Sequence, residues 1–504
     1  MMNILLVYPK YPDTFWSFKH ALKFVSKKAM NPPLGLITIA SLLPGEWQKK
    51  LIDINVNKLR TKHILWADYV FISAMSTQLK SANEIIEKCK KLKRKIVAGG
   101  PLFTENPENF PNVDHLVLNE AEITLPQLLN DLKNGSARKL YKTSEFPELN
   151  ESPLPDYSLL NTSKYATLSI QYTRGCPFDC EFCDITALYG HKVRTKSTTQ
   201  ILSELENLYN IGFRGNVFFV DDNFIGNKKI LKTDLLPSMI KWMRAKNNPF
   251  IFITEASINL ADDNELMELM TQAGFSNVFV GIETPEEASL AECNKIQNIN
   301  RDLIQSVNKI QAAGIEVTAG FIVGFDNDPP SVFQRQIDFI QQSGIITAMV
   351  GLLNAPKKTR LYRRLKNEGR IISEWSGSNT DYTFNFIPKM NKKDLINGYQ
   401  KIISGIYSHK PFYDRVLHFL KHYEPKVKNK TKVPFTDFIA FLKSIVVLGI
   451  FDYSRKYYWQ IFFWSLFNKP KLFPLAIRYS IYGYHFRKIF DDGTIERWND
   501  RTTE

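Results

Sequence analysis

The segment Thr167–Cys183, TLSIQYTRGCPFDCEFC, joins a short strand-like run to a loop that carries three cysteines. Five more short apolar runs follow, and amphipathic segments such as Thr199–Tyr209 and Leu303–Ala313 separate them, which predicts alternating strands and helices. Such an alternation predicts a partial (β/α)6 barrel over residues 165–372. The six runs are Thr167–Tyr172, Val217–Asp221, Phe250–Ala256, Asn277–Gly281, Glu316–Ile322 and Thr347–Leu352.

Cys176, Cys180 and Cys183 begin four residues after the first of these runs. Active sites of β/α barrels lie at the carboxyl ends of the strands, so we expect this loop on the catalytic rim. Three thiolates in one loop can bind three irons of a [4Fe-4S] cluster and leave the fourth iron open. The alternatives are a zinc site with His191 as the fourth ligand, or three buried structural cysteines.

A second α/β pattern precedes this barrel. Its apolar runs alternate with helical segments, which predicts a parallel, Rossmann-like sheet over residues 1–142 whose ligand lies beyond the carboxyl ends of the strands. A proline-rich segment without periodicity, residues 143–164, is interpreted as a linker. The runs are Ile4–Tyr8, Leu51–Ile54, Tyr69–Ser73, Lys95–Ala98 and His115–Leu118.

The remaining residues, 373–504, are predicted to be mainly helical, basic and aromatic, with uncharged runs too short to span a bilayer. They form either an ordinary helical core or a surface that faces a membrane or a lipid substrate. The chain has 65 Lys and Arg against 51 Asp and Glu, but these basic residues are spread out and no recognition motif occurs, so nucleic acid is a poor fit. The amino terminus is interpreted as a strand rather than a signal peptide, and the sparse cysteines favour the cytoplasm.

The cysteine loop resembles the signature of the radical S-adenosylmethionine (SAM) superfamily, in which an aromatic residue, here Phe182, directly precedes the last cysteine. The resemblance implies that SAM binds the open iron. It also implies a SAM-binding segment after the second strand, where Val220-Asp221-Asp222-Asn223 has acidic residues in place of the family's glycines. The SAM contacts implied in this way are Phe182, Asp222, Glu255, Ser257 and Gly324.

A Rossmann-like domain before such a barrel resembles the cobalamin-binding class of these enzymes. The sequence lacks Asp-x-His-x-x-Gly, and Asp114-His115 has the wrong spacing, so the cobalt would have no histidine ligand. A Rossmann-like domain with a purely structural role is the alternative. The cobalamin contacts implied by the resemblance are Ser73, Ala74, Met75, Gly99, Gly100 and Glu120.

Four longer stretches resemble the hopanoid methylase group: Phe15–Leu22, Pro32–Leu36, Ala98–Thr104 and Glu255–Asp262. This resemblance implies a cobalamin-dependent radical SAM methyltransferase that methylates an unactivated carbon, for example of a hopanoid-like lipid. The cofactors carry the chemistry, so no catalytic side chain is assigned. Flavodoxin or ferredoxin is the expected reductant, and the C-terminal region is expected to allow peripheral contact with the inner face of the membrane.

Two other functions remain open from the sequence. A radical SAM enzyme with a different outcome would perform cyclisation, rearrangement or sulfur insertion. A non-catalytic sensor would use the corrinoid or the iron–sulfur cluster as a receptor. For the aromatic residues Phe15, Trp16 and Phe18, packing between domains is favoured over contact with a ligand.

Overall fold

The computed structural model describes residues 2–378, 380, 382–427 and 435–491. Their contacts divide the chain into two compact units. The first consists of Met1–Pro12, Lys28–Pro177 and Asp184–Phe213, and the second of Asp13–Lys27, Phe178–Cys183 and the chain from Arg214 onward. The domain boundaries drawn from the sequence stay a prediction, and we describe each unit by itself.

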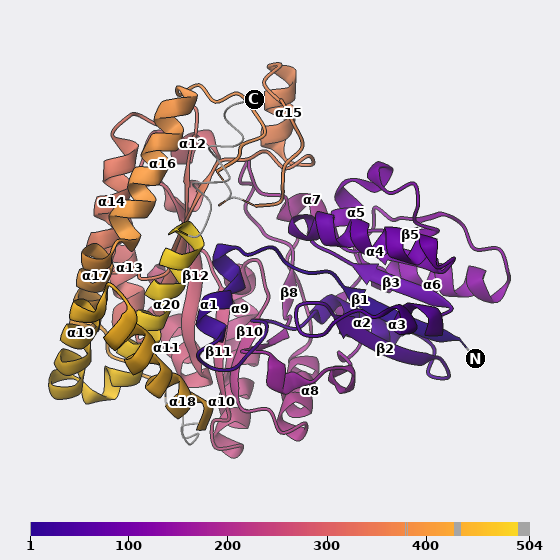
Figure 1. The fold of residues 1–504 in the computed structure, drawn as a ribbon, viewed down its shortest axis with the longest axis horizontal. Helices are drawn as coiled ribbons and strands as arrows, with labels where there is room; N and C mark the ends of the chain where they lie inside the picture. The colour runs from indigo at the N-terminus through magenta and orange to yellow at the C-terminus, as the bar shows by residue number, and fades with distance from the viewer. Residues whose placement is uncertain (1, 379, 381, 428–434, 492–504) are drawn as a thin grey trace. The chain divides into compact units, whose positions relative to one another are not determined.

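The first unit is built on a parallel sheet with the strand order β2-β1-β3-β4-β5-β6 (Figure 1). All five predicted runs form strands of this sheet, which confirms the Rossmann-like fold. The sequence did not reveal β6, because two residues are too short to show any periodicity. The strands are β1 (Asn3–Tyr8), β2 (Gln48–Asp53), β3 (Tyr69–Ser73), β4 (Lys95–Gly99), β5 (His115–Val117) and β6 (Leu140–Tyr141).

Helices alternate with these strands and share an apolar core with them. In α4, Ala82, Ile85, Ile86 and Cys89 are all buried, and this spacing places them on one helical face. That face packs in the same cluster as residues of β1, β3, β4 and β5. The helices of the first unit are α2 (Leu34–Leu42), α3 (Thr61–Trp66), α4 (Leu79–Lys91), α5 (Pro101–Glu105), α6 (Ala121–Lys133), α7 (Ile185–Tyr189) and α8 (Thr198–Asn210).

The predicted linker, residues 143–164, contains only three short 3-10 turns. Leu149 and Tyr157 are nonetheless buried, and the Asp156 N–H donates to the Ile37 carbonyl at 3.0 Å. The segment therefore packs as part of the first unit.

Five of the six barrel runs form parallel strands of the second unit, in the order β14-β13-β12-β11-β10. The first run forms β7 (Leu168–Ile170), which belongs to the first unit. Together with the Rossmann-like sheet, these strands confirm the predicted α/β class. The strands of the second unit are β10 (Gly215–Phe219), β11 (Phe250–Glu255), β12 (Phe275–Glu283), β13 (Glu316–Val323) and β14 (Ala348–Leu352).

Helices join these strands, as the amphipathic segments predict. A π-helical turn, Leu231–Leu235, connects α9 directly to α10. The helices are α9 (Lys228–Ile230), α10 (Leu236–Ala245), α11 (Asn264–Ala273), α12 (Glu287–Glu292), α13 (Leu303–Ala312), α14 (Val332–Ser343) and α15 (Arg360–Asn367).

The C-terminal region is helical, as predicted, and continues the second unit, with α16 running alongside α14 (Figure 1). The hydroxyl groups of Tyr399 and Tyr407 on α16 donate to carbonyls of β14, at 3.0 and 2.7 Å. Among the described residues, no helix is long and apolar enough to cross a bilayer. The helices are α16 (Lys392–Tyr407), α17 (His409–His422), α18 (Phe435–Ser444), α19 (Arg455–Asn468) and α20 (Phe473–Asp491).

The N-terminal aromatic cluster packs on the last of these helices, next to the short helix α1 (Lys19–Leu22). Phe15 stacks on Phe486 with ring centroids 4.4 Å apart, and Phe18 stacks on His485 at 5.2 Å. Phe15 and Phe18 therefore pack against α20 within the second unit.

Candidate active site

Two of the predicted SAM residues lie at neighbouring strands: Asp222 follows β10, and Glu255 is the last residue of β11. Burial and, to a smaller extent, the negative charges of Asp222 and Asp221 together raise the pKa of Glu255 to about 8. Glu255 therefore keeps its proton at neutral pH. A protonated carboxyl group can donate a hydrogen bond, which a carboxylate cannot.

Ser257 is held between two asparagines at the same edge of the sheet. Its N–H donates to Asn223 Oδ1 at 3.2 Å, and its hydroxyl group donates to Asn259 Oδ1 at 2.7 Å. Asn223 is 3% exposed and comes directly after Asp222. The structure thus brings Asp222, Glu255 and Ser257 together. Asn223 belongs to the SAM-binding segment implied by the resemblance, but its contact with Ser257 was not predicted from the sequence.

Gly324 follows β13, where Asp328 organises the turn. The N–H groups of Gly324 and Phe325 both donate to Asp328 Oδ2, at 2.8 and 3.1 Å. Phe182 reaches the same place, because its ring lies 6.2 Å from that of Phe325 and packs against a buried apolar cluster. The structure therefore places the predicted residues Phe182 and Gly324 near each other.

The second half of the cysteine loop is anchored by the chain after α12. The Glu181 N–H donates to the Cys293 carbonyl at 2.8 Å, and Asn294 Nδ2 donates to the Asp179 carbonyl at 2.9 Å. Gln297 Nε2 lies 3.9 Å from Cys180 Sγ. These contacts hold Cys180 and its neighbours through residues distant in sequence.

A buried ion pair at the end of β12 adds a charge to this region. Lys295 Nζ lies 2.7 Å from Glu283 Oε1, and both side chains are largely buried. A Cβ atom at Gly281 would collide with Glu283 Oε1 and Lys295 Nζ, so the glycine leaves room for the pair in this arrangement. Burial raises the pKa of Cys180, whereas the positive charge of Lys295 opposes that rise.

Cys176 lies in the first unit, where its N–H donates to the Gly190 carbonyl at 3.3 Å. All five cysteines are free thiols, so the donor set suits an iron–sulfur cluster. His191, the alternative zinc ligand, is exposed. Within the described residues, no three His, Cys, Asp or Glu side chains are already gathered as a metal site.

The predicted cobalamin residues lie at the carboxyl ends of β3 and β4 and just after β5. Ala74 is buried, whereas the Met75 side chain is 47% exposed. Gly100 has φ +91°, and a Cβ atom there would lie 2.7 Å from Ser73 Oγ. Gly99, the last residue of β4, and Gly100 therefore place no side chain at this edge of the sheet, which suits the close approach of a flat ligand.

Glu120 and His115 have roles within the protein itself. The Glu120 carboxylate accepts hydrogen bonds from Arg194 Nη2 at 2.7 Å and from Arg174 Nη1 at 2.5 Å. His115 begins β5, at the opposite end from the ligand edge, and its Nδ1 lies 2.6 Å from the Arg138 carbonyl oxygen. This agrees with the absence of the cobalamin histidine motif.

Three family models match successive parts of the chain. The radical SAM superfamily matches residues 170–340, and a B12 binding domain matches residues 26–129. A domain of unknown function, DUF4070, matches residues 359–496. The fold and these matches define a radical SAM enzyme with a cobalamin-binding domain.

Similar proteins extend this class to a reaction. An uncharacterized methyltransferase of Synechocystis sp. is 41% identical over 490 residues, which cover 96% of this chain and 91% of the relative. The hopanoid C-2 methylase of Rhodopseudomonas palustris is 37% identical over 386 residues, covering 75% and 73%. The chain therefore belongs to the family of cobalamin-dependent radical SAM methyltransferases.

The fold is also found in a solved structure with these cofactors bound. The radical SAM methyltransferase TsrM of Kitasatospora setae, solved with cobalamin and a [4Fe-4S] cluster, has a TM-score of 0.61 at 12% identity and covers 97% of this chain and 99% of its own. The predicted enzyme class is confirmed, as are its three cofactors, a [4Fe-4S] cluster, SAM and cobalamin. A small-molecule substrate is consistent with this class.

Proposed function

We propose that this methyltransferase acts on a carbon of a polycyclic isoprenoid lipid of the hopanoid type. The observation that carries the proposal is the 37% identity to the hopanoid C-2 methylase, which extends over 75% of this chain. Tetrapyrroles are the second candidate class, because a bacteriochlorophyllide d methyltransferase of Chlorobaculum tepidum is 25% identical over 413 residues.

We assign the cofactor contacts to the residues predicted from the sequence. Cys176, Cys180 and Cys183 supply thiolates for the cluster, and the side chains at the ends of β10 and β11 bind SAM together with Phe182 and Gly324. Cobalamin binds at the sheet edge formed by Ser73, Ala74, Met75, Gly99 and Gly100. Glu120 supports this edge by binding Arg174 and Arg194. When bound, the cofactors supply radical formation and methyl transfer, while the protein binds, orients and shields them from water.

The proton on Glu255 defines its role in this assignment. A neutral carboxyl group beside two carboxylates can donate one hydrogen bond and accept another. Ribose hydroxyl groups accept and donate in the same way, so we assign Glu255 to the SAM ribose. Ser257, fixed by Asn223 and Asn259, adds a second polar contact there.

The C-terminal region supports a lipid substrate. Phe438, Leu442, Val446 and Ile450 are 46–53% exposed and recur every four residues along α18 and the π-helical turn that follows it, Ile445–Phe451. Phe451 and Tyr453 are 76% and 91% exposed. A soluble surface rarely leaves so many large apolar side chains in one segment, and such surfaces contact membranes or partners.

The same surface continues onto α19. Phe463 and Phe467 are 49% and 78% exposed and stack on each other with ring centroids 6.3 Å apart. Exposed basic residues, among them Arg455, Lys456 and Lys471, lie in the same segment. Apolar side chains next to lysine and arginine favour anionic lipid headgroups. We therefore propose peripheral contact of α18, the π-helical turn and α19 with the inner face of the membrane, from a cytoplasmic location.

The test is anaerobic reconstitution with iron, sulfide and hydroxocobalamin, followed by incubation with SAM and either flavodoxin or ferredoxin, the proposed electron donors. Hopanoid lipids and tetrapyrroles serve as parallel substrates, and mass spectrometry detects the methylated product. A methylated hopanoid that disappears in the Cys176→Ala, Cys180→Ala and Cys183→Ala variants supports the proposal. Methylation of the tetrapyrrole alone, or 5′-deoxyadenosine formation with no methylated product, would overturn it.

A further inference from the structure

The helix α15 shares its core with the cysteine loop. Its residues Leu361 and Leu365 are buried in the apolar cluster that includes Phe325, and Phe182 packs against that cluster. The Leu361 N–H also donates to the Glu181 carbonyl at 2.9 Å. The first turns of α15 are therefore in direct contact with the chain between Cys180 and Cys183.

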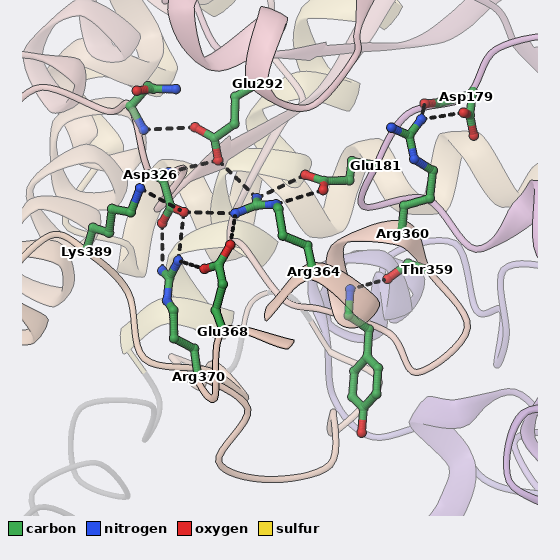
Figure 2. A network of polar contacts seen from close by, with 12 residues as sticks. Asp179, Glu181, Glu292, Asp326, Thr359, Arg360, Arg364, Glu368, Arg370 and Lys389 are labelled. Atoms are coloured by element: carbon green, nitrogen blue, oxygen red, sulfur yellow. Dashed lines mark hydrogen bonds and ion pairs between the residues drawn. The ribbon is translucent and has the colours of Figure 1, made fainter. Parts of the chain in front are cut away.

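The strongest contact is made by Arg364, one turn further along this helix. Its Nε lies 2.8 Å from Glu181 Oε1 and its Nη2 lies 3.0 Å from Glu181 Oε2 (Figure 2). This is the bidentate arrangement in which a guanidinium fixes both oxygens of a carboxylate. The Glu181 side chain is only 10% exposed, so little water competes for it.

Arg364 is itself held in place by other carboxylates. Its Nη1 donates to Asp326 Oδ2 at 3.0 Å, and its Nη2 lies 3.4 Å from Glu292 Oε1. Asp326 is fixed in turn by Arg370, at 2.6 Å, and Glu292 accepts the Asp326 N–H at 3.1 Å (Figure 2). The guanidinium is therefore oriented by the protein without any help from a cluster.

We propose that Arg364 is a positioning residue for the [4Fe-4S] cluster. It holds Glu181 so that Cys180 and Cys183 stand on an ordered segment before iron binds. A loop that is already ordered loses less conformational entropy when it binds the cluster. Partners that orient metal ligands from outside the first coordination sphere act in this way.

This inference goes beyond the proposed substrate, and it rests on the proposed cluster ligands. It also gives a role to the region of unknown function, residues 359–496, because α15 lies at its beginning. That region would contribute to the radical SAM site through a side chain that contacts the loop.

The test compares Arg364→Ala, Arg364→Lys and Glu181→Gln in the full-length reconstituted enzyme. The matched control is Arg363→Ala, because Arg363 lies on the same helix and its side chain is exposed. The readouts are the rate at which a chelator removes iron and the midpoint potential of the cluster. Thermal unfolding of each apo variant reports on the fold.

We expect Arg364→Ala to lose iron about 10-fold faster or more, as is typical when an outer-shell partner is removed. Its midpoint potential should become more negative, because Glu181 and Glu292 lose the positive charge of Arg364 and their negative charges disfavour an added electron. Arg364→Lys keeps the positive charge but cannot bind Glu181 in the bidentate arrangement. Its midpoint potential should therefore lie closer to that of the parent than that of Arg364→Ala does, while iron loss stays fast. Glu181→Gln should also lose iron faster.

Unchanged iron loss and potential in both Arg364→Ala and Glu181→Gln would overturn the inference, as would an equal effect of Arg363→Ala. If Arg364→Ala does not fold, Glu181→Gln and Arg364→Lys decide the question. The cysteine ligands are tested separately, because a cluster retained in Cys180→Ala or Cys183→Ala would refute the ligand assignment itself. Loss of the cluster in those variants, with no effect at Arg364, would refute only the positioning role.

Discussion

Arg174 Nη1 lies 2.5 Å from Glu120 Oε2, and the two side chains are 12% and 2% exposed. Arg174 also bonds Glu122 at 2.8 Å, and Arg194 bonds the other oxygen of Glu120 at 2.7 Å. The turn after β5 is thereby joined to the chain two residues before Cys176. A buried network of this kind is sensitive to the loss of any one member.

The first prediction concerns this network. Glu120→Ala leaves two buried guanidinium groups with fewer partners, so we expect a loss of about 3–5 kcal/mol in the free energy of unfolding. Denaturant unfolding of the apo protein measures it. Glu148→Ala is the control, because Glu148 pairs with Lys192 at 3.9 Å and both are exposed, and it should change stability by less than about 0.5 kcal/mol. Equal effects of the two variants would contradict the prediction.

The second prediction is a pH dependence set by Glu255. Its pKa rises from 4.5 to about 8 on folding, so between these values the folded state binds more protons than the unfolded state. The free energy of unfolding contributed by this group therefore falls as the pH rises from about 4.5 to about 8. In Glu255→Gln this contribution is absent, because the amide does not titrate.

Thermal unfolding of the apo protein between pH 6 and about pH 9 checks this. The parent should lose more stability than Glu255→Gln across the range, whereas the exposed control Glu46→Gln should follow the parent. Parallel curves for the parent and Glu255→Gln would show that Glu255 is ionised in the folded protein.

The third prediction uses two glycines with positive φ. A side chain at Gly100 would meet Ser73 Oγ at 2.7 Å, whereas at Gly135, with φ +71°, it would find nothing within 4 Å. Both alanine variants should lose about 1–2 kcal/mol from backbone strain. Only Gly100→Ala should also lower cobalamin occupancy, measured by absorbance after reconstitution. Full occupancy in Gly100→Ala would argue against this edge as the corrin site.

The fourth prediction concerns the exposed surface of α18, the π-helical turn and α19. Phe451→Asp and Phe467→Asp should weaken sedimentation with anionic vesicles and leave activity on detergent-dispersed substrate unchanged, because the change affects only lipid contact. Gln460→Asp adds the same charge at an exposed position of α19 and should have a smaller effect. Equal sedimentation of both phenylalanine variants and the parent would contradict this prediction. A change in the oligomeric state of these variants would then show that the apolar side chains hold two copies of the chain together.

The strands and the cysteine spacing were predictable because their signals are local. An apolar run such as Tyr69–Ser73 is visible in five residues, and the three cysteines lie within a single loop. The C-terminal helices were also predicted from the sequence, but the packing of α16 on β14 through Tyr399 and Tyr407 was not. Local sequence patterns contain no information about which distant segments of the chain meet.

The sequence by itself therefore determined the α/β class, the cofactors implied by the cysteine motif and the order of the regions along the chain. Only the tertiary structure decided that Asn223 holds Ser257, that Lys295 pairs with Glu283, and that Arg364 holds Glu181 from 183 residues away. These partners are ordinary polar residues in no recognisable motif. Their roles arise from long-range packing, which brings charges together in a buried, low-dielectric setting that no short stretch of sequence records.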